Sequence, residues 1–206
     1  MVIILKQPSV YSYAQIVDTA FELVREQGWS GVSTRAIAKK MGSSTMPIYS
    51  HVRSVEELEK EVRQKAQELL NKFQQRPYTE HVLLNLAFGY VVFARDEKNL
   101  FRFLYLEKPE RMDLEDVSGM KESFFAEFGE QSEQVKALSE MQEAGQEAVV
   151  QYPWIFTHGL AMLVNSGAFE SNSDEVIMRY LKNAGEAFYL WGMQKGGNDL
   201  ESKDEK

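Results

Sequence analysis

The chain has 206 residues, which is enough for one or two domains that bury a core without disulfide or metal staples. Apolar residues make up 44% of the chain and charged residues 26%, and this balance excludes an intrinsically disordered protein. The sequence contains no cysteine, which excludes disulfides, thiolate metal sites and cysteine nucleophiles.

Charge is distributed unevenly along the chain. The formal net charge is −8, but residues 1–53 alone carry +3 and the remainder carries −11. A basic N-terminal part is typical of a surface that meets nucleic acid, although the whole chain is acidic. No apolar run approaches the roughly 20 residues of a membrane-spanning helix, so we expect a cytoplasmic protein with no membrane partner.

The N-terminal part is predicted to consist of helices, because apolar residues recur at helical spacing and alternating runs are absent. Gly28 and Gly42 stand where helices end, while Ser33 and Ser54 stand where helices begin. Ser43 or Ser44 is expected to cap the third helix. The predicted helices cover residues 11–27, 34–41, about 44–51 and 54–73.

The remainder of the chain also shows helical periodicity. The predicted helices cover residues 79–96, 99–106, 118–128, 131–151, 153–169 and 174–194, with a loop over 107–117. We therefore predict an all-α protein with an N-terminal three-helix domain that contains a helix-turn-helix, and a larger C-terminal helical domain. The predicted boundaries are 1–53 for the first domain, 54–75 for a connecting helix, 76–195 for the second domain and 196–206 for a flexible tail.

Residues 33–53 have the pattern of a helix-turn-helix. Ala38 is small enough to let the second helix cross the first closely, and Gly42 can adopt the positive φ of the turn. Ile48 and Val52 are expected to face inward. The outward residues would then be polar or small and would suit the major groove of DNA.

The N-terminal part resembles the DNA-binding domain of the tetracycline repressor (TetR) family of bacterial transcription regulators. The resemblance covers residues 11–70 and rests on Ile16, Ala20 and Leu23, Gly28-Trp29, Val32-Ser33, Ile37-Ala38, Gly42, Ile48-Tyr49, His51-Val52 and Glu57-Leu58. It implies a dimeric transcription regulator, with a four-helix bundle built from the last two helices of each chain. Weaker similarity to ligand-domain helices of the family is found over Tyr90–Leu106 and around Trp154.

The DNA-binding residues follow from this placement. The candidates are Ser33, Thr34, Arg35, Ser44, Thr45, Met46, Pro47, Tyr49, Ser50, His51 and Arg53. Core packing is the alternative for Tyr49 and His51, and a solvated surface is the alternative for Arg35. The family usually has a phosphate-binding lysine where this chain has Val55, so Arg53 or the N-terminal amides of the fourth helix would take its role.

The helix expected at 153–169 is apolar nearly all round, which predicts burial. Within it Trp154, His158, Met162 and Asn165 share one face, a mixture typical of pockets for small, largely apolar ligands. Phe88 and Phe103 are candidates for the same pocket. The alternative is that His158 is a core histidine hydrogen-bonded to a neighbouring helix.

The last predicted helix has two adjoining apolar stripes. One stripe contains Ile177, Leu181, Ala184, Phe188 and Trp191, which we take as the candidate dimer interface. The other contains Val176, Tyr180, Asn183, Ala187 and Leu190. Two stripes predict one face for the chain's own core and one for a partner in a homodimer, but the pattern leaves open which is which. A central core helix of a monomer is the alternative.

Enzyme and metal motifs are absent from the sequence, so we predict neither catalysis nor a cofactor. The leading hypothesis is a homodimeric transcription repressor that binds a pseudo-palindromic double-stranded DNA operator and is released from it by a small molecule. One alternative is a ligand-independent DNA-binding dimer whose acidic C-terminal domain recruits a protein. Another is an enzyme domain fused to a DNA-binding domain.

Overall fold

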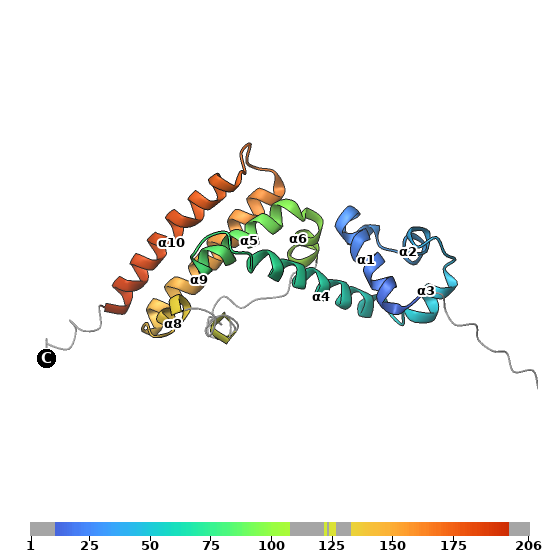
Figure 1. Cartoon of the computed structure of the whole chain (residues 1–206), viewed down its shortest axis with the longest axis horizontal. Helices are drawn as coiled ribbons and strands as arrows, with labels where there is room; N and C mark the ends of the chain where they lie inside the picture. The colour runs from blue at the N-terminus through green and yellow to red at the C-terminus, as the bar shows by residue number, and fades with distance from the viewer. Residues whose placement is uncertain (1–10, 108–121, 123, 127–132, 198–206) are drawn as a thin grey trace, which may run out of the picture. The chain divides into compact units, whose positions relative to one another are not determined.

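The structure is a computed structural model that describes residues 11–107, 122, 124–126 and 133–197. These residues form helices joined by turns and contain no strand, which confirms the all-α prediction (Figure 1). Most of the predicted loop 107–117, most of the predicted helix 118–128, and nearly all of the predicted tail lie outside the described residues.

The chain divides into two compact units, which we treat separately. The head unit contains residues up to Leu69 together with Glu97–Pro109, and the body unit contains Leu70–Asp96 together with Glu110–Lys206. Helix α6 therefore belongs to the head unit, whereas chain order alone had placed it in the C-terminal domain.

Helix α1 (Tyr13–Gln27) opens the head unit with a capping box. The Ser12 hydroxyl accepts a hydrogen bond from the backbone N–H of Gln15, and the Gln15 side chain accepts one from the backbone N–H of Ser12. Gly28 ends the helix at a φ of 78°, a conformation that favours glycine, and the short 3-10 helix η1 (Trp29–Gly31) follows. The turn directs Trp29 onto Phe103, whose ring centroid lies 5.1 Å away.

The helix-turn-helix consists of α2 (Thr34–Lys40) and α3 (Met46–His51). Ser33 caps α2 as predicted, because its hydroxyl accepts a hydrogen bond from the backbone N–H of Ala36 at 3.1 Å. Gly42 forms the turn with a φ of 65°, also as predicted. Helix α3 begins after Thr45, which provides no side-chain cap, so the expected serine cap of this helix is wrong.

Helix α4 (Val55–Gln74) begins in the head unit and ends in the body unit. The hydroxyl of Ser54 accepts a hydrogen bond from the backbone N–H of Glu57 at 3.0 Å, which secures its first turn. Leu58, Val62 and Ala66 are buried along one side of α4. Helix α6 (Lys98–Tyr105) packs against α1 and completes the core of the head unit.

The body unit contains α5 (Val82–Asp96), α8 (Glu133–Ser139), α9 (Glu143–Ser166) and α10 (Asp174–Gly197). Helix α9 lies between α5 and α10 and packs on both (Figure 1). Glycines permit the close contacts: a Cβ at Gly89 of α5 would lie 2.3 Å from the backbone oxygen of Phe73. At Gly192 of α10, a Cβ would lie 2.7 Å from the side chain of Val149 on α9.

One predicted break in the body unit is wrong. The sequence suggested that a helix starts at Pro153, but α9 continues through this residue and loses only the hydrogen bond that proline cannot donate. The chain turns earlier instead, between α8 and α9. There the Gln146 side-chain amide donates to the backbone oxygens of Ser139 and Met141 at 2.7 and 2.9 Å, which satisfies carbonyls at the turn.

Candidate functional site

Helix α3 is buried on one side and open on the other. Ile48 is only 1% exposed and anchors the helix in the head unit, whereas Met46 is 75% exposed and Tyr49 is 69% exposed. Tyr49 and Met46 thus place one large polar-tipped and one large apolar side chain in solvent on the same short helix. The outer side of α3 is therefore available for contact with another molecule.

Small polar groups surround these two residues. Ser44 and Ser50 are exposed, and Thr45, Pro47 and His51 are partly buried. The Ser50 hydroxyl donates its hydrogen to the backbone oxygen of Pro47 at 2.8 Å. Its oxygen can therefore only accept a hydrogen bond from another molecule. In α2, Ser33 is occupied by its capping role, Thr34 is partly buried, and Arg35 is exposed. The structure thus brings the candidate DNA contacts onto α3 and the start of α2.

The cations of the head unit fall into two groups. Lys40 pairs with Glu26 of α1 at 2.6 Å, and Arg25 is engaged by Glu97. Arg35, Lys39 and Arg53 are exposed, and none of them forms an ion pair within the part of the chain that the structure describes. Each of these three could neutralise a phosphate without first losing an internal ion pair.

The start of α4 differs from the family pattern noted above. Val55 is 61% exposed there, and the first turn contains Glu56 and Glu57. Two carboxylates at this helix N-terminus oppose a phosphate, even though the backbone amides alone would attract one. This charge arrangement favours Arg53 over the α4 amides as the replacement for the missing lysine.

A second candidate site lies in the body unit around His158 of α9. The hydroxyl of Tyr90 on α5 hydrogen-bonds Nδ1 of His158 at 2.8 Å. The Trp154 ring stacks on the imidazole, with centroids 5.4 Å apart and planes 9° apart. Burial lowers the pKa of His158, because a charged imidazolium is poorly solvated there. The arrangement therefore favours a neutral imidazole whose orientation is fixed.

The other predicted ligand-site residues do not all lie beside His158. Met162 is partly buried on α9, while Asn165 is buried and its amide donates to the backbone oxygen of Ala94 at 2.8 Å, which ties α9 to α5. Phe88 is buried against Tyr78 in the body core. Phe103 lies in the core of the head unit, so the structure does not bring it together with His158 in one unit.

Tyr90 is the residue that sequence reasoning missed. It was grouped with the neighbouring phenylalanines as core aromatic surface. Its hydroxyl was the available signal, because a buried tyrosine usually requires a hydrogen-bond partner and a phenylalanine does not. The partner is 68 positions away in the chain, so the spacing of residues could not identify it.

The two apolar stripes of α10 differ in how far they are buried within the chain. Ile177 and Leu181 are 1% and 4% exposed within their own chain. Further along the same stripe Ala184 is partly buried, and Phe188 and Trp191 contact Tyr152 of α9. Ile177 and Leu181, at the start of the candidate interface stripe, therefore cover the core of the body unit and are removed from the interface set, while Ala184, Phe188 and Trp191 remain candidates.

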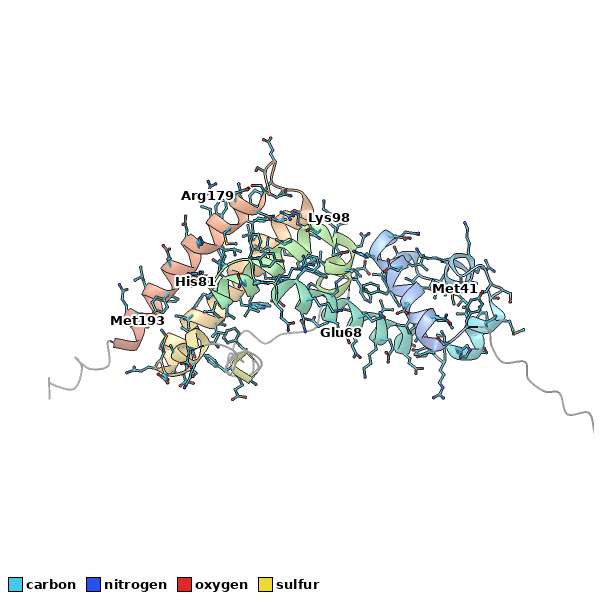
Figure 2. All side chains as sticks on the ribbon, in the orientation of Figure 1. Met41, Glu68, His81, Lys98, Arg179 and Met193 are labelled. Carbon is cyan, nitrogen blue, oxygen red and sulfur yellow. The ribbon has the colours of Figure 1, made fainter. Side chains whose placement is uncertain are left out.

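The second stripe of α10, which adjoins the first, and the neighbouring side of α9 expose apolar residues. We call this surface the outer face; its residues are Tyr152, Ile155 and Leu163 of α9 and Tyr180, Ala187 and Leu190 of α10. Arg179 and Met193 of α10 are exposed as well (Figure 2). An exposed apolar surface that spans two helices packed against each other is typical of a protein–protein interface.

Metal and membrane sites receive no support from the described residues. No group of three or more metal-binding side chains comes together among them. None of their helices combines the length and the apolar character that crossing a bilayer requires.

A helix-turn-helix with an anchored inner side, an exposed recognition helix and exposed cations defines a DNA-binding protein. Residues 16–62 match the model of a family described as bacterial regulatory proteins, tetR family. The match covers the helix-turn-helix and its flanking helices, and it supports membership of the TetR family and a role as a DNA-binding transcription regulator. The comparison with curated proteins gave no match.

Proposed function

We propose that the chain is a homodimeric transcriptional repressor that a small, largely apolar molecule releases from its operator. The single observation that carries the DNA-binding part is the orientation of α3, which buries Ile48 and exposes Met46 and Tyr49. A recognition helix of this kind reads base edges in the major groove.

In this proposal Thr45, the residue before α3, and Met46 and His51 of α3 contact base edges. Tyr49, Arg35 and Arg53 contact phosphates, which position the protein without selecting a sequence. The −11 charge outside residues 1–53 would repel DNA, so binding is confined to residues 1–53.

The outer face supports the homodimer. Leaving its apolar side chains in water is unfavourable by about 25 cal/mol per Å², and a second copy of the same face would remove them from water. Two heads would then meet successive major grooves about 34–36 Å apart on a pseudo-palindromic operator.

The ligand site is proposed beside Trp154, His158 and Met162 in the body unit. The neutral imidazole, oriented by the hydrogen bond between its Nδ1 and the Tyr90 hydroxyl, suits an uncharged ligand. A ligand that binds one dimer state better than the other shifts the equilibrium between them and weakens DNA binding by the same free energy.

The test begins with a pool of random double-stranded DNA from which the purified chain selects its targets. We expect the selected sequences to share a two-fold-symmetric motif, because each head of a homodimer reads one half-site. Compounds that raise the melting temperature of the chain are then added to the complex, and at least one should release the DNA. Selection of no common sequence contradicts the DNA-binding proposal, and a common sequence without symmetry contradicts the homodimer.

A further inference from the structure

Met46 and Ser50 form the outermost line of α3. Successive residues of an α-helix are turned by about 100°, so positions 46 and 50 lie about 20° on either side of the direction opposite Ile48. Ile48 is buried and fixes the inner side of the helix, while Met46 and Ser50 are both exposed. Tyr49 lies about 80° from the outermost direction, on the flank of the helix. If the outer side of α3 enters a groove, Met46 and Ser50 reach deepest and Tyr49 stays nearer the groove's edge.

The hydroxyl of Ser50 is restricted in the base atoms that it can recognise. Its hydrogen is donated to the backbone oxygen of Pro47 at 2.8 Å, which leaves only the oxygen lone pairs for DNA. In the major groove the donors that can fill those lone pairs are the amino groups of adenine and cytosine, whereas N7, O6 and O4 are acceptors. Pairing with an acceptor would first require Ser50 to break its bond to Pro47. Ser50 therefore favours an amino group.

The side chain of Met46 selects by a different kind of contact. It is unbranched, flexible and apolar, and its thioether is only a weak hydrogen-bond acceptor. The apolar feature that the major groove presents is the C5-methyl group of thymine. Contact between the two removes apolar surface from water on both sides, and Met46 is 75% exposed before binding. Met46 therefore favours a thymine.

We propose that Met46 and Ser50 together read a two-part feature of each operator half-site: a thymine methyl group at Met46 and the amino group of an adenine or cytosine at Ser50. Residues four apart are separated by about 6 Å along a helix axis, and stacked base pairs by about 3.4 Å. With α3 lying along the groove, the two features belong to base pairs one or two steps apart. The inference rests on the proposed DNA-binding function and adds the base chemistry that it recognises, together with a role for Ser50.

The thymine contact is tested with the full-length chain on the DNA selected from the random pool. Each thymidine of the half-site is replaced in turn by deoxyuridine, which removes the methyl group and keeps the base pair. One replacement should weaken binding about fourfold per half-site, the scale of one buried methyl group. In Met46→Ala that replacement should have almost no effect, because the side chain that covers the methyl group is gone. Met46→Leu is the matched control: it keeps an apolar side chain and should keep the methyl effect.

The amino contact is tested on bases one or two steps from that thymine. Adenine is replaced by purine, which lacks the N6 amino group, and cytosine by its analogue without the N4 amino group. The wild type should lose about fivefold in affinity per half-site at one of these positions, beyond the loss that Ser50→Ala shows there. Comparing the two chains cancels the cost of the weakened base pair, because both bind the same DNA. Ser30→Ala is the control: Ser30 is exposed on η1, outside the proposed contacts, and this variant should behave as the wild type.

The outcomes separate the inference from the function on which it rests. A selected half-site without thymine, or a methyl effect that is equal in the wild type and in Met46→Ala, overturns the assignment of Met46. Loss of the methyl effect in Met46→Leu as well as in Met46→Ala overturns the apolar contact. An amino effect that is equal in the wild type and in Ser50→Ala overturns the assignment of Ser50. Each of these results leaves the proposed function intact, whereas a wild-type chain that selects no common sequence overturns the function itself.

Discussion

The hydroxyl of Tyr90 on α5 and Nδ1 of His158 on α9 lie 2.8 Å apart, and Trp154 stacks on the same imidazole. The hydrogen bond links two helices of the body unit and fixes the direction of the ring. The same geometry is compatible with a structural histidine and with a ligand-orienting one. Substitutions that remove one or both partners can separate the two roles.

Replacing His158 by phenylalanine should abolish release from DNA by an inducing compound while leaving operator affinity near that of the wild type. The variant leaves the Tyr90 hydroxyl without this partner, which should lower the free energy of unfolding by about 1 kcal/mol. The double variant Tyr90→Phe with His158→Phe removes both polar groups and should recover most of that loss without recovering the response. Thermal melts and DNA-release titrations measure the two effects. A less stable His158→Phe chain that still responds to the compound removes His158 from the proposed site.

Stability should fall as the pH is lowered through the range in which histidine titrates. Burial holds the pKa of His158 below its ordinary value of 6.5, so the unfolded chain binds the proton at a higher pH than the folded chain does. The free energy of unfolding is therefore unaffected by this residue above about pH 6.5 and decreases as the pH falls from there through the folded pKa. Urea unfolding between pH 7.5 and 5 should show a shallower decrease in His158→Phe than in the wild type.

Much of the helix-turn-helix could be predicted because its determinants are local. Ser33 caps the helix that it directly precedes, and Gly42 supplies the positive φ of the turn. The alternation of buried and exposed positions also follows from helical geometry, which placed Ile48 inside and Tyr49 outside. Each of these features depends on neighbours a few residues away, and a sequence displays such neighbours directly.

Features that depend on distant residues could not be predicted in this way. Arg25 and Glu97 are 72 positions apart, and their pairing brings α6 into the head unit. The start expected at Pro153 failed because packing of α9 against α5 and α10 outweighs one missing backbone hydrogen bond. The two stripes of α10 were recognised, but only the folded chain distinguishes the stripe that covers its own core.

Substitutions on α3 and α2 should divide into two classes by their effect on DNA recognition. Tyr49→Phe and Arg35→Ala remove proposed phosphate contacts, so both should weaken binding to all sequences by a similar factor. Thr45→Ala and His51→Ala remove proposed base contacts and should change the preferred sequence, with about 1–3 kcal/mol of discrimination lost at the affected base pair. Repeating the DNA selection with each variant is the measurement. An operator sequence unchanged in both Thr45→Ala and His51→Ala contradicts the assignment of base readout to α3.

Salt should weaken operator binding steeply, because the proposed contacts replace counterions on the phosphates. Affinity should decrease by about three orders of magnitude or more between 50 and 200 mM salt if six or more phosphates are neutralised. Arg53→Ala should reduce the slope of log affinity against log salt by about 1. Lys40→Ala is the control, because Lys40 already pairs with Glu26 at 2.6 Å, and its slope should match the wild type. A flat salt response of the wild-type chain contradicts the phosphate contacts altogether.

The outer face of α9 and α10 should hold the dimer together. Ala187 is exposed on this face, and Ala187→Glu would place a carboxylate in an apolar contact, which is costly unless the charge is paired. Light scattering should show a dimer for the wild type and a monomer for this variant, with the helix content of the two chains equal by circular dichroism. Lys182→Glu is the control: Lys182 is exposed but lies outside the outer face, so the variant should remain a dimer.

Leu181→Lys should behave differently from both, because Leu181 is 4% exposed within its own chain and a buried charge there should unfold the body unit. A wild-type chain that is monomeric at micromolar concentration, or an Ala187→Glu variant that stays dimeric, would remove the outer face from the proposed interface.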